Sequence, residues 1–172
     1  NPTTIYGGKW ECNTQVNGIQ ILGATHITID HINMRNFLLY GIQSTSTSAI
    51  YIYFSWIGSH YQYTANYTSS VGISVTSSDN SFIGVRVFGA WTGFDLQGGG
   101  DTLINCHALW SSSDSTEYDT SVGFYLHGIH NLIKCYSDGY ATAFKTTGDT
   151  EYLTDCWCQW WSGLTGKQVA ME

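Results

Sequence analysis

The sequence predicts an all-β fold, a right-handed single-stranded parallel β-helix of about six to seven coils with two loop insertions. The first observation behind this fold class is a short strand, built around a glycine and a following apolar residue, that recurs along the chain. Its glycine position falls at Gly18, Gly41, Gly72, Gly93, Gly123 and, in a weaker copy, Ala143. Repeats of ~20 to 50 residues indicate solenoids, and crossovers between parallel strands are almost always right-handed.

The second observation is another short apolar strand that follows each glycine strand. We place it at residues 27–29, 50–52, 83–85, 104–106, 133–135 and 154–156. Successive glycine positions are 23, 31, 21, 30 and 20 residues apart, and the ends of the second strands are 23, 33, 21, 29 and 21 residues apart. The two segments therefore repeat with nearly the same spacing, which favours stacked coils over coincidence.

The coils follow one another in chain order. Residues 5–13 predict an incomplete opening coil, and later coils begin near each glycine position. Two coils are longer than the rest because residues 59–70 and 111–121 are inserted directly before a glycine strand, and such insertions often form the binding face of a solenoid. Since side chains alternate along a strand, the inward row of the glycine strands should be buried and stacked: Ile19, Ile42, Ile73, Phe94, Phe124 and Phe144.

Composition limits the classes of function. The 172 residues, expected to be one domain over residues 1–172, carry a net charge of -7 with only six lysines and arginines. This balance argues against nucleic acid as a partner, and no apolar run is long enough for membrane insertion. The chain begins Asn1-Pro2 without an initiator methionine, so we expect either a mature chain or, more simply, an excerpt of a longer one.

Three of the five cysteines are predicted to be buried thiols. Cys106, Cys135 and Cys156 share one repeat position and should stack in the core, unbridged. No histidine shares that position, and Cys156-Trp157-Cys158 lacks the two-residue gap that zinc knuckles use. The sequence therefore predicts no metal and no cofactor.

The outward row of the glycine strands gathers polar side chains in three successive coils. Asp95 and Gln97, then Tyr125 and His127, then Lys145 would occupy neighbouring rungs ~4.8 Å apart. Each of these residues alone fits an ordinary solvated face, but together they are the best candidate site. For an elimination reaction, Tyr125 or His127 would remove the proton and Lys145 would stabilise the resulting negative charge.

The insertion at residues 111–121 enters the same sheet and carries Glu117, Tyr118 and Asp119. For glycoside hydrolysis, Asp95 with Asp119 or Glu117 would form the carboxylate pair, about 5 to 5.5 Å apart for retention or roughly 6.5 to 9.5 Å for inversion. A rival aromatic face would be formed by Arg86, His107, Tyr136 and Trp157, joined by Trp110, Trp160 and Trp161. The predicted ligand-binding residues are Gln97, Tyr118, Tyr125, His127, Lys145, Trp110 and Trp157. His26, His31, His60 and His130 are interpreted as structural or solvent-facing.

The coil pattern, the opening residues 7–13 and the passage 18–30 resemble the pectate-lyase-like superfamily of parallel β-helices, with phage tailspike and appendage proteins closest in appearance. The resemblance implies binding or cleavage of acidic or complex polysaccharides by hydrolysis, elimination or epimerisation. The Asn-Thr-Asp, Asp-Asp and Gly-His-Gly motifs of polygalacturonases are absent, so no catalytic residue of that family transfers to this chain.

Two hypotheses of different classes follow. The first is a carbohydrate-binding β-helix domain of a tailspike or cell-surface protein, displayed on a virion or secreted, with a polysaccharide or surface glycan as its partner. Whether such a domain also depolymerises its glycan is left open, with hydrolysis favoured over elimination. The alternative is a non-catalytic structural shaft that holds a homotrimer together in a viral appendage.

Overall fold

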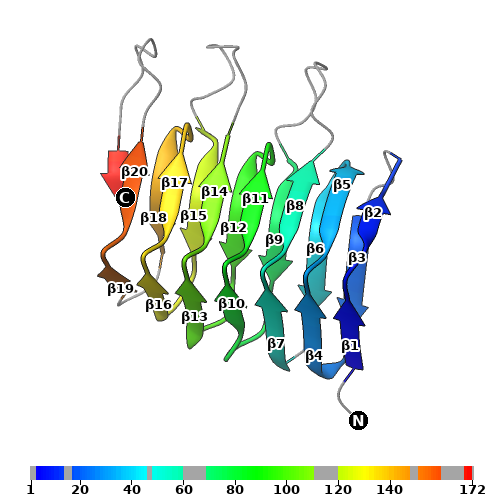
Figure 1. Ribbon diagram of the computed structural model, residues 1–172. Coiled ribbons are helices and arrows are strands. Elements are labelled where there is room, and N and C mark those ends of the chain that lie inside the picture. Colours follow the sequence, from blue (N-terminus) through cyan, green and yellow to red (C-terminus); the bar gives the residue numbers. More distant parts are fainter. Residues whose placement is uncertain are drawn as a thin grey trace.

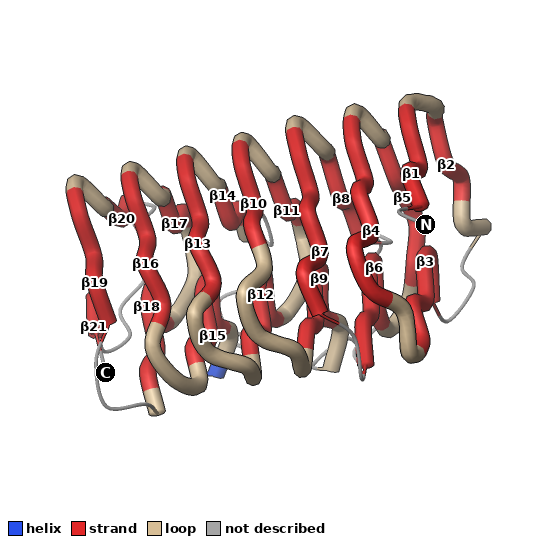
Figure 2. The backbone as a smooth tube through the Cα atoms, turned by 90° about the horizontal axis from the view of Figure 1, so that it is seen from below, coloured by secondary structure: helices blue, strands red, loops and turns tan. Residues whose placement is uncertain are grey.

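A computed structural model describes residues 3–13, 17–45, 48–59, 69–110, 120–147, 151–159 and 169–171. In these residues the chain forms three parallel sheets of seven strands each, stacked into a right-handed β-helix (Figures 1 and 2). Each of the seven coils contributes one strand to sheet A, then one to sheet B, then one to sheet C. The predicted fold class is confirmed.

The strands pair in chain order within each sheet. Sheet A consists of β1 (Thr3–Tyr6), β4 (Thr25–Asp30), β7 (Ser48–Tyr53), β10 (Ser81–Ile83), β13 (Asp101–Ile104), β16 (His130–Ile133) and β19 (Glu151–Thr154). Sheet B consists of β2 (Lys9–Glu11), β5 (Asn33–Phe37), β8 (Trp56–Ser59), β11 (Arg86–Phe88), β14 (His107–Leu109), β17 (Tyr136–Asp138) and β20 (Trp157–Gln159). Sheet C consists of β3 (Asn17–Leu22), β6 (Tyr40–Thr45), β9 (Val71–Val75), β12 (Thr92–Leu96), β15 (Val122–Leu126), β18 (Thr142–Thr146) and β21 (Val169–Met171).

The inward row of sheet C is buried and stacked, as the sequence predicts. Ile42, Ile73, Phe94 and Phe124 are fully buried. Ile19 and Phe144, at the two ends of the row, are nearly so. The ring of Phe94 stacks on Phe124 at 4.8 Å between centroids, and Phe124 stacks on Phe144 at 5.1 Å. These contacts hold successive coils together along the axis of the solenoid.

The repeated glycines are explained by a close approach of three strands. A Cβ atom placed on Gly41 would lie 2.6 Å from the carbonyl oxygen of Gly72, and one on Gly93 would lie 2.5 Å from that of Gly123. The same atoms would press on side chains of sheet B. At these positions only a residue without a side chain avoids both contacts, so glycine returns as the second residue of β3, β6, β9, β12 and β15, and Ala143 takes its place in β18.

The corner between sheets A and B has the same backbone conformation in every coil. Its residue has a positive φ each time: Gly7 (66°), His31 (54°), Phe54 (42°), Gly84 (64°), Asn105 (52°), Lys134 (53°) and Asp155 (53°). The corners are linked by backbone hydrogen bonds from one coil to the next, for example from His31 N to Tyr53 O. A one-residue left-handed bend therefore separates the two sheets.

This corner corrects the second predicted repeat. From the fourth coil on, the segments at residues 83–85, 104–106, 133–135 and 154–156 span the bend and are not strands, and each coil has three strands where the sequence suggested two. The long connections at residues 60–68 and 111–119 join sheet B to sheet C, where the insertions were expected, but they lie outside the described residues. A further long connection, residues 160–168, precedes β21 and was not predicted.

The cysteine row is confirmed in part. Cys106 and Cys135 are buried, whereas Cys156 is only half-buried because it belongs to the last coil, and all five cysteines are free. Hydrogen bonding with Cys106 together with burial raises the pKa of Cys135 to about 12. Among the described residues, no group of three or more histidines, cysteines or acidic residues is arranged to hold a metal ion. No helix of the described chain is long and apolar enough to cross a membrane.

Candidate functional site

The predicted polar residues of sheet C meet on its outer face. Asp95 of β12 pairs with Tyr125 of β15, which pairs with Lys145 of β18, so the three side chains occupy one row across three coils. Gln97 and His127 directly follow their strands. Together with Thr147, these residues form what we call the sheet C cluster.

Asp95 is the centre of this cluster. Its Oδ1 atom lies 3.3 Å from Nε2 of His127, and its Oδ2 atom accepts a hydrogen bond of 2.8 Å from Nε2 of Gln97. The second ring nitrogen of His127, Nδ1, lies 2.8 Å from Oγ1 of Thr147. Both carboxylate oxygens and both imidazole nitrogens therefore face protein groups, and the Asp95 side chain is only 15% exposed.

Tyr125 and Lys145 complete the cluster. The ring of Tyr125 lies 4.0 Å from the ring of His127, and the Lys145 ammonium lies 4.9 Å from the centre of the Tyr125 ring. Such an arrangement is a cation–π contact, which holds the ammonium over the phenol ring. The cluster thus presents an ammonium, a phenol and the amide of Gln97 to a ligand, over an anionic centre.

The predicted second carboxylate cannot be placed against Asp95, because Glu117, Tyr118 and Asp119 lie outside the described residues. In the described part of the cluster, Asp95 is the carboxylate. Its two oxygens are engaged by His127 and Gln97. The described arrangement suits a positioning role for Asp95 better than that of a general acid, which must reach the leaving oxygen of the substrate.

The rival face on sheet B exists, but its geometry differs from a sugar-stacking surface. Arg86, His107, Tyr136 and Trp157 are in register on the outer side of sheet B. His107 stacks on Tyr136 at 4.4 Å, and Tyr136 stacks on Trp157 at 3.7 Å. The rings therefore cover the faces that they turn toward one another, and Trp157 at the end of the stack is 55% exposed. Burial, followed by the nearby Arg86 charge, lowers the pKa of His107, although Asp138 opposes the shift.

Trp110 was predicted to bind ligand, but its side chain is buried. The residue directly follows β14, and its side chain is only 6% exposed. It packs edge-on against Trp91 at 5.6 Å and against Tyr140 at 5.9 Å, inside the corner between sheets B and C. Trp157 is 55% exposed, as expected of a surface residue. Trp160 and Trp161 lie outside the described residues.

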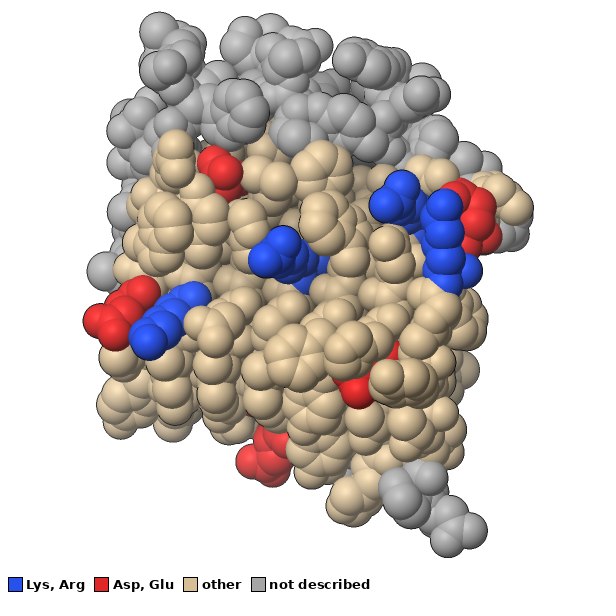
Figure 3. Space-filling view, viewed as in Figure 1, with Lys and Arg blue, Asp and Glu red and all other residues tan. Residues whose placement is uncertain are grey.

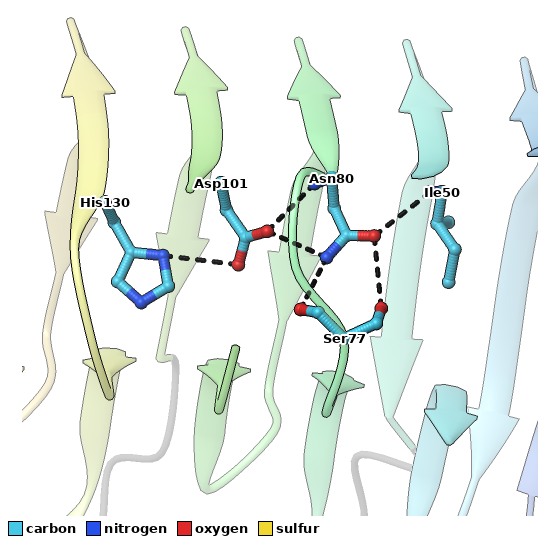
Figure 4. Close-up of polar contacts among 5 residues, drawn as sticks. All are labelled: Ile50, Ser77, Asn80, Asp101 and His130. Carbon is cyan, nitrogen blue, oxygen red and sulfur yellow. Dashed lines mark hydrogen bonds and ion pairs between the residues drawn. The ribbon is translucent and has the colours of Figure 1, made fainter. Parts of the chain in front are cut away.

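A row of buried polar side chains at the start of sheet A was not predicted as a unit (Figure 4). Asp101 Oδ1 accepts hydrogen bonds from the backbone N and the side-chain Nδ2 of Asn80, and Asp101 Oδ2 lies 3.2 Å from Nδ1 of His130. Asn80 Oδ1 accepts a hydrogen bond from the Ile50 backbone. Asp101 and His130 are fully buried, so no ligand reaches them from outside. The row is structural, in line with the structural interpretation of His130.

Comparisons with known proteins identify little beyond this geometry. No family model matches the chain, and no curated protein matches it. Among solved structures, the crystal structure of pectate lyase Pel9A is similar with a TM-score of 0.47 and 16% sequence identity, over 80% of this chain. The chain spans 43% of the length of that pectate lyase. No residue role or activity is transferred from it, and the resemblance to tailspike proteins stays a prediction.

Proposed function

We propose that this protein is a carbohydrate-binding β-helix domain whose ligand contacts the sheet C cluster. The observation that carries the proposal is the linked set of contacts from Gln97 through Asp95 and His127 to Thr147, with Tyr125 and Lys145 above it. Sugars offer many hydroxyl groups to hydrogen-bond partners and an apolar C–H face to aromatic rings. Groups that are already fixed by one another lose little conformational entropy when such a ligand binds.

Binding is favoured over catalysis as the basic activity. Glycoside hydrolysis ordinarily needs two carboxyl groups that flank the scissile bond, whereas Oδ2 of Asp95 accepts a hydrogen bond from Gln97 and Oδ1 faces His127 at 3.3 Å. The finer form of the proposal includes a depolymerase in which Glu117 or Asp119 supplies the second carboxylate. It also includes a tailspike or similar appendage, virion or extracellular display, and a homotrimer. The second carboxylate rests on the position of the insertion in the sequence, and the tailspike context rests on the sequence resemblance.

A glycan array followed by titration calorimetry on the best ligand tests the binding proposal. Lys145→Met keeps the aliphatic stem but removes the ammonium, and a lost hydrogen bond to a charged group should weaken binding about tenfold to a hundredfold. Lys134→Met is the matched control, because Lys134 is an exposed lysine at the corner between sheets A and B. Equal affinities for the parent and Lys145→Met would place the ligand elsewhere.

A reducing-sugar assay on the same glycan separates binding from cleavage. If Asp95 were a general acid or base, Asp95→Asn would lower turnover by about 10²- to 10⁴-fold with the fold intact. If the domain only binds, the parent shows no turnover and Asp95→Asn weakens retention by loosening His127. Failure of the parent to bind any glycan would reject the proposal and favour the structural shaft.

A further inference from the structure

Three exposed aromatic rings form a row along the corner between sheets A and B. Tyr6 is 72% exposed, Phe54 is 59% exposed, and the side chain of His31 between them is 53% exposed. The ring centroids of Tyr6 and His31 are 5.7 Å apart, and those of His31 and Phe54 are 5.3 Å apart. Each ring belongs to a successive coil. We call these three residues the corner row.

The left-handed corner explains why these side chains are exposed. His31 and Phe54 have φ values of 54° and 42°, a conformation that a bulky residue rarely adopts. The ring of Phe54 lies over the next corner, where a Cβ on Gly84 would come within 2.9 Å of its Cδ1 atom. Asp30 Oδ1 lies 2.6 Å from Nδ1 of His31 and fixes the orientation of the imidazole. The row is therefore ordered although it is exposed.

The rings of the corner row are less closely stacked than those on sheet B, where the centroids are 4.4 and 3.7 Å apart. Neighbouring rings are tilted by 45° and 43°, whereas Tyr136 and Trp157 are tilted by only 19°. A tilted, half-exposed ring leaves a π face free for a ligand. Figure 3 shows the side formed by sheets A and B, on which uncharged side chains predominate.

The shape of the row suits a narrow polymer better than a protein surface. Tyr6 and Phe54, with ~150–250 Å² each, offer roughly 200–330 Å² at these exposures, to which the smaller ring of His31 adds. A stable protein partner usually covers about 800 Å² on each side. The spacing of 5.3 to 5.7 Å is instead close to the advance per sugar in an extended chain of pyranose rings. One sugar could therefore face each ring.

We propose that Tyr6, His31 and Phe54 form a second ligand site, which binds a neutral polysaccharide chain running along the corner. The apolar C–H faces of successive sugars would lie against the rings. The carboxylate of Asp30 contacts the row and would repel an acidic chain. This site does not depend on the sheet C cluster, because sheet C lies behind sheets A and B in Figure 1.

Native affinity electrophoresis tests the site, with hydroxyethylcellulose and xyloglucan as neutral probes and polygalacturonate as an acidic one. Phe54→Leu and Tyr6→Leu keep an apolar side chain but remove the ring, and each should weaken retention by the neutral polymers about two- to tenfold. Phe54→Trp should bind at least as well as the parent. Tyr152→Leu is the matched control, since Tyr152 is also 59% exposed and lies on sheet A in the last coil.

Several outcomes would overturn the proposal. The proposal fails if neither neutral polymer retains the parent, or if both leucine variants are retained as strongly as the parent. It also fails if Tyr152→Leu weakens retention as much as the leucine variants do, or if polygalacturonate retains the parent as strongly as the neutral polymers do. A loss of retention in both leucine variants, with Tyr152→Leu unchanged, assigns the binding to the corner row and not to sheet C. A circular dichroism melt checks folding. If Phe54→Leu is unfolded, Tyr6→Leu decides, because Tyr6 is the more exposed of the two.

Discussion

Replacing Gly93 with alanine is the sharpest test of how the coils are packed. The new Cβ atom would lie 2.5 Å from the carbonyl oxygen of Gly123 and 2.9 Å from Cβ of Ala108. The first of these distances is about 0.9 Å short of the 3.4 Å at which ordinary contact begins. The closest atom belongs to the backbone and cannot rotate away, so β12 and β15 must separate and strain the hydrogen bonds between them.

Overpacking of this kind costs about 1–3 kcal/mol, and the backbone contact places Gly93→Ala near 3 kcal/mol. For a domain of this size that lowers the melting temperature by roughly 6–12 °C. Gly58→Ala is the control, because its nearest neighbours would be 3.6 Å away. Gly58→Ala should leave the free energy of unfolding unchanged or raise it by about 0.4–1 kcal/mol, because alanine reduces the conformational entropy of the unfolded chain. Urea and thermal unfolding measure both, and equal stabilities of the two variants would refute the packing argument.

Three further predictions concern the interior. Phe124→Ala removes a ring stacked between two others and should cost about 3–5 kcal/mol in urea unfolding. Asp101→Ala should cost about 3–5 kcal/mol, because it leaves buried donors of Asn80 without their acceptor. The folded pKa of Cys135, about 12, lies above its ordinary value. Its stabilising contribution is therefore complete below about pH 9 and is lost as the pH rises towards 12. Cys135→Val should flatten that part of the stability profile, and a profile identical to the parent's would contradict the assignment.

The fold could be predicted because close packing between coils requires the same residue type at the same position of successive coils. Gly41 and Gly93 are required by contacts with the next coil, and the residue after each glycine points into the core. Both features are visible as spacing in the sequence. The outer cluster followed from the same register, since Asp95, Tyr125 and Lys145 alternate with buried residues along their strands.

The errors occur where strands end. The rule that side chains alternate holds within a strand, but Trp110 lies one residue beyond β14 and turns into a corner. Ile83-Gly84-Val85 has an apolar residue on either side of a bend, which gives the same pattern as a short strand. The contact between Asp101 and His130 was missed because the two residues begin strands in different coils. Only the three-dimensional register aligns them.

The corner row also lies where strands end, and it allows a last prediction. Glycine and asparagine adopt positive φ more readily than other residues. Gly84 and Asn105 occupy this corner in other coils. The backbone bend therefore does not require the ring of Phe54. In Phe54→Asn, the relief of backbone strain and the lost partial burial of the ring should offset each other. The free energy of unfolding should then stay within about 1 kcal/mol of the parent.

The same variant should lose the retention by neutral polysaccharides that the corner row is proposed to provide. Urea unfolding and affinity electrophoresis on one preparation measure both quantities. A residue kept for stability would show the reverse pattern, a loss of about 2 kcal/mol or more with retention unchanged. In that case, the exposed rings would be part of the coil packing and the argument for a ligand at the corner would fail. Stability kept while binding falls would show that the ring serves the surface and not the fold.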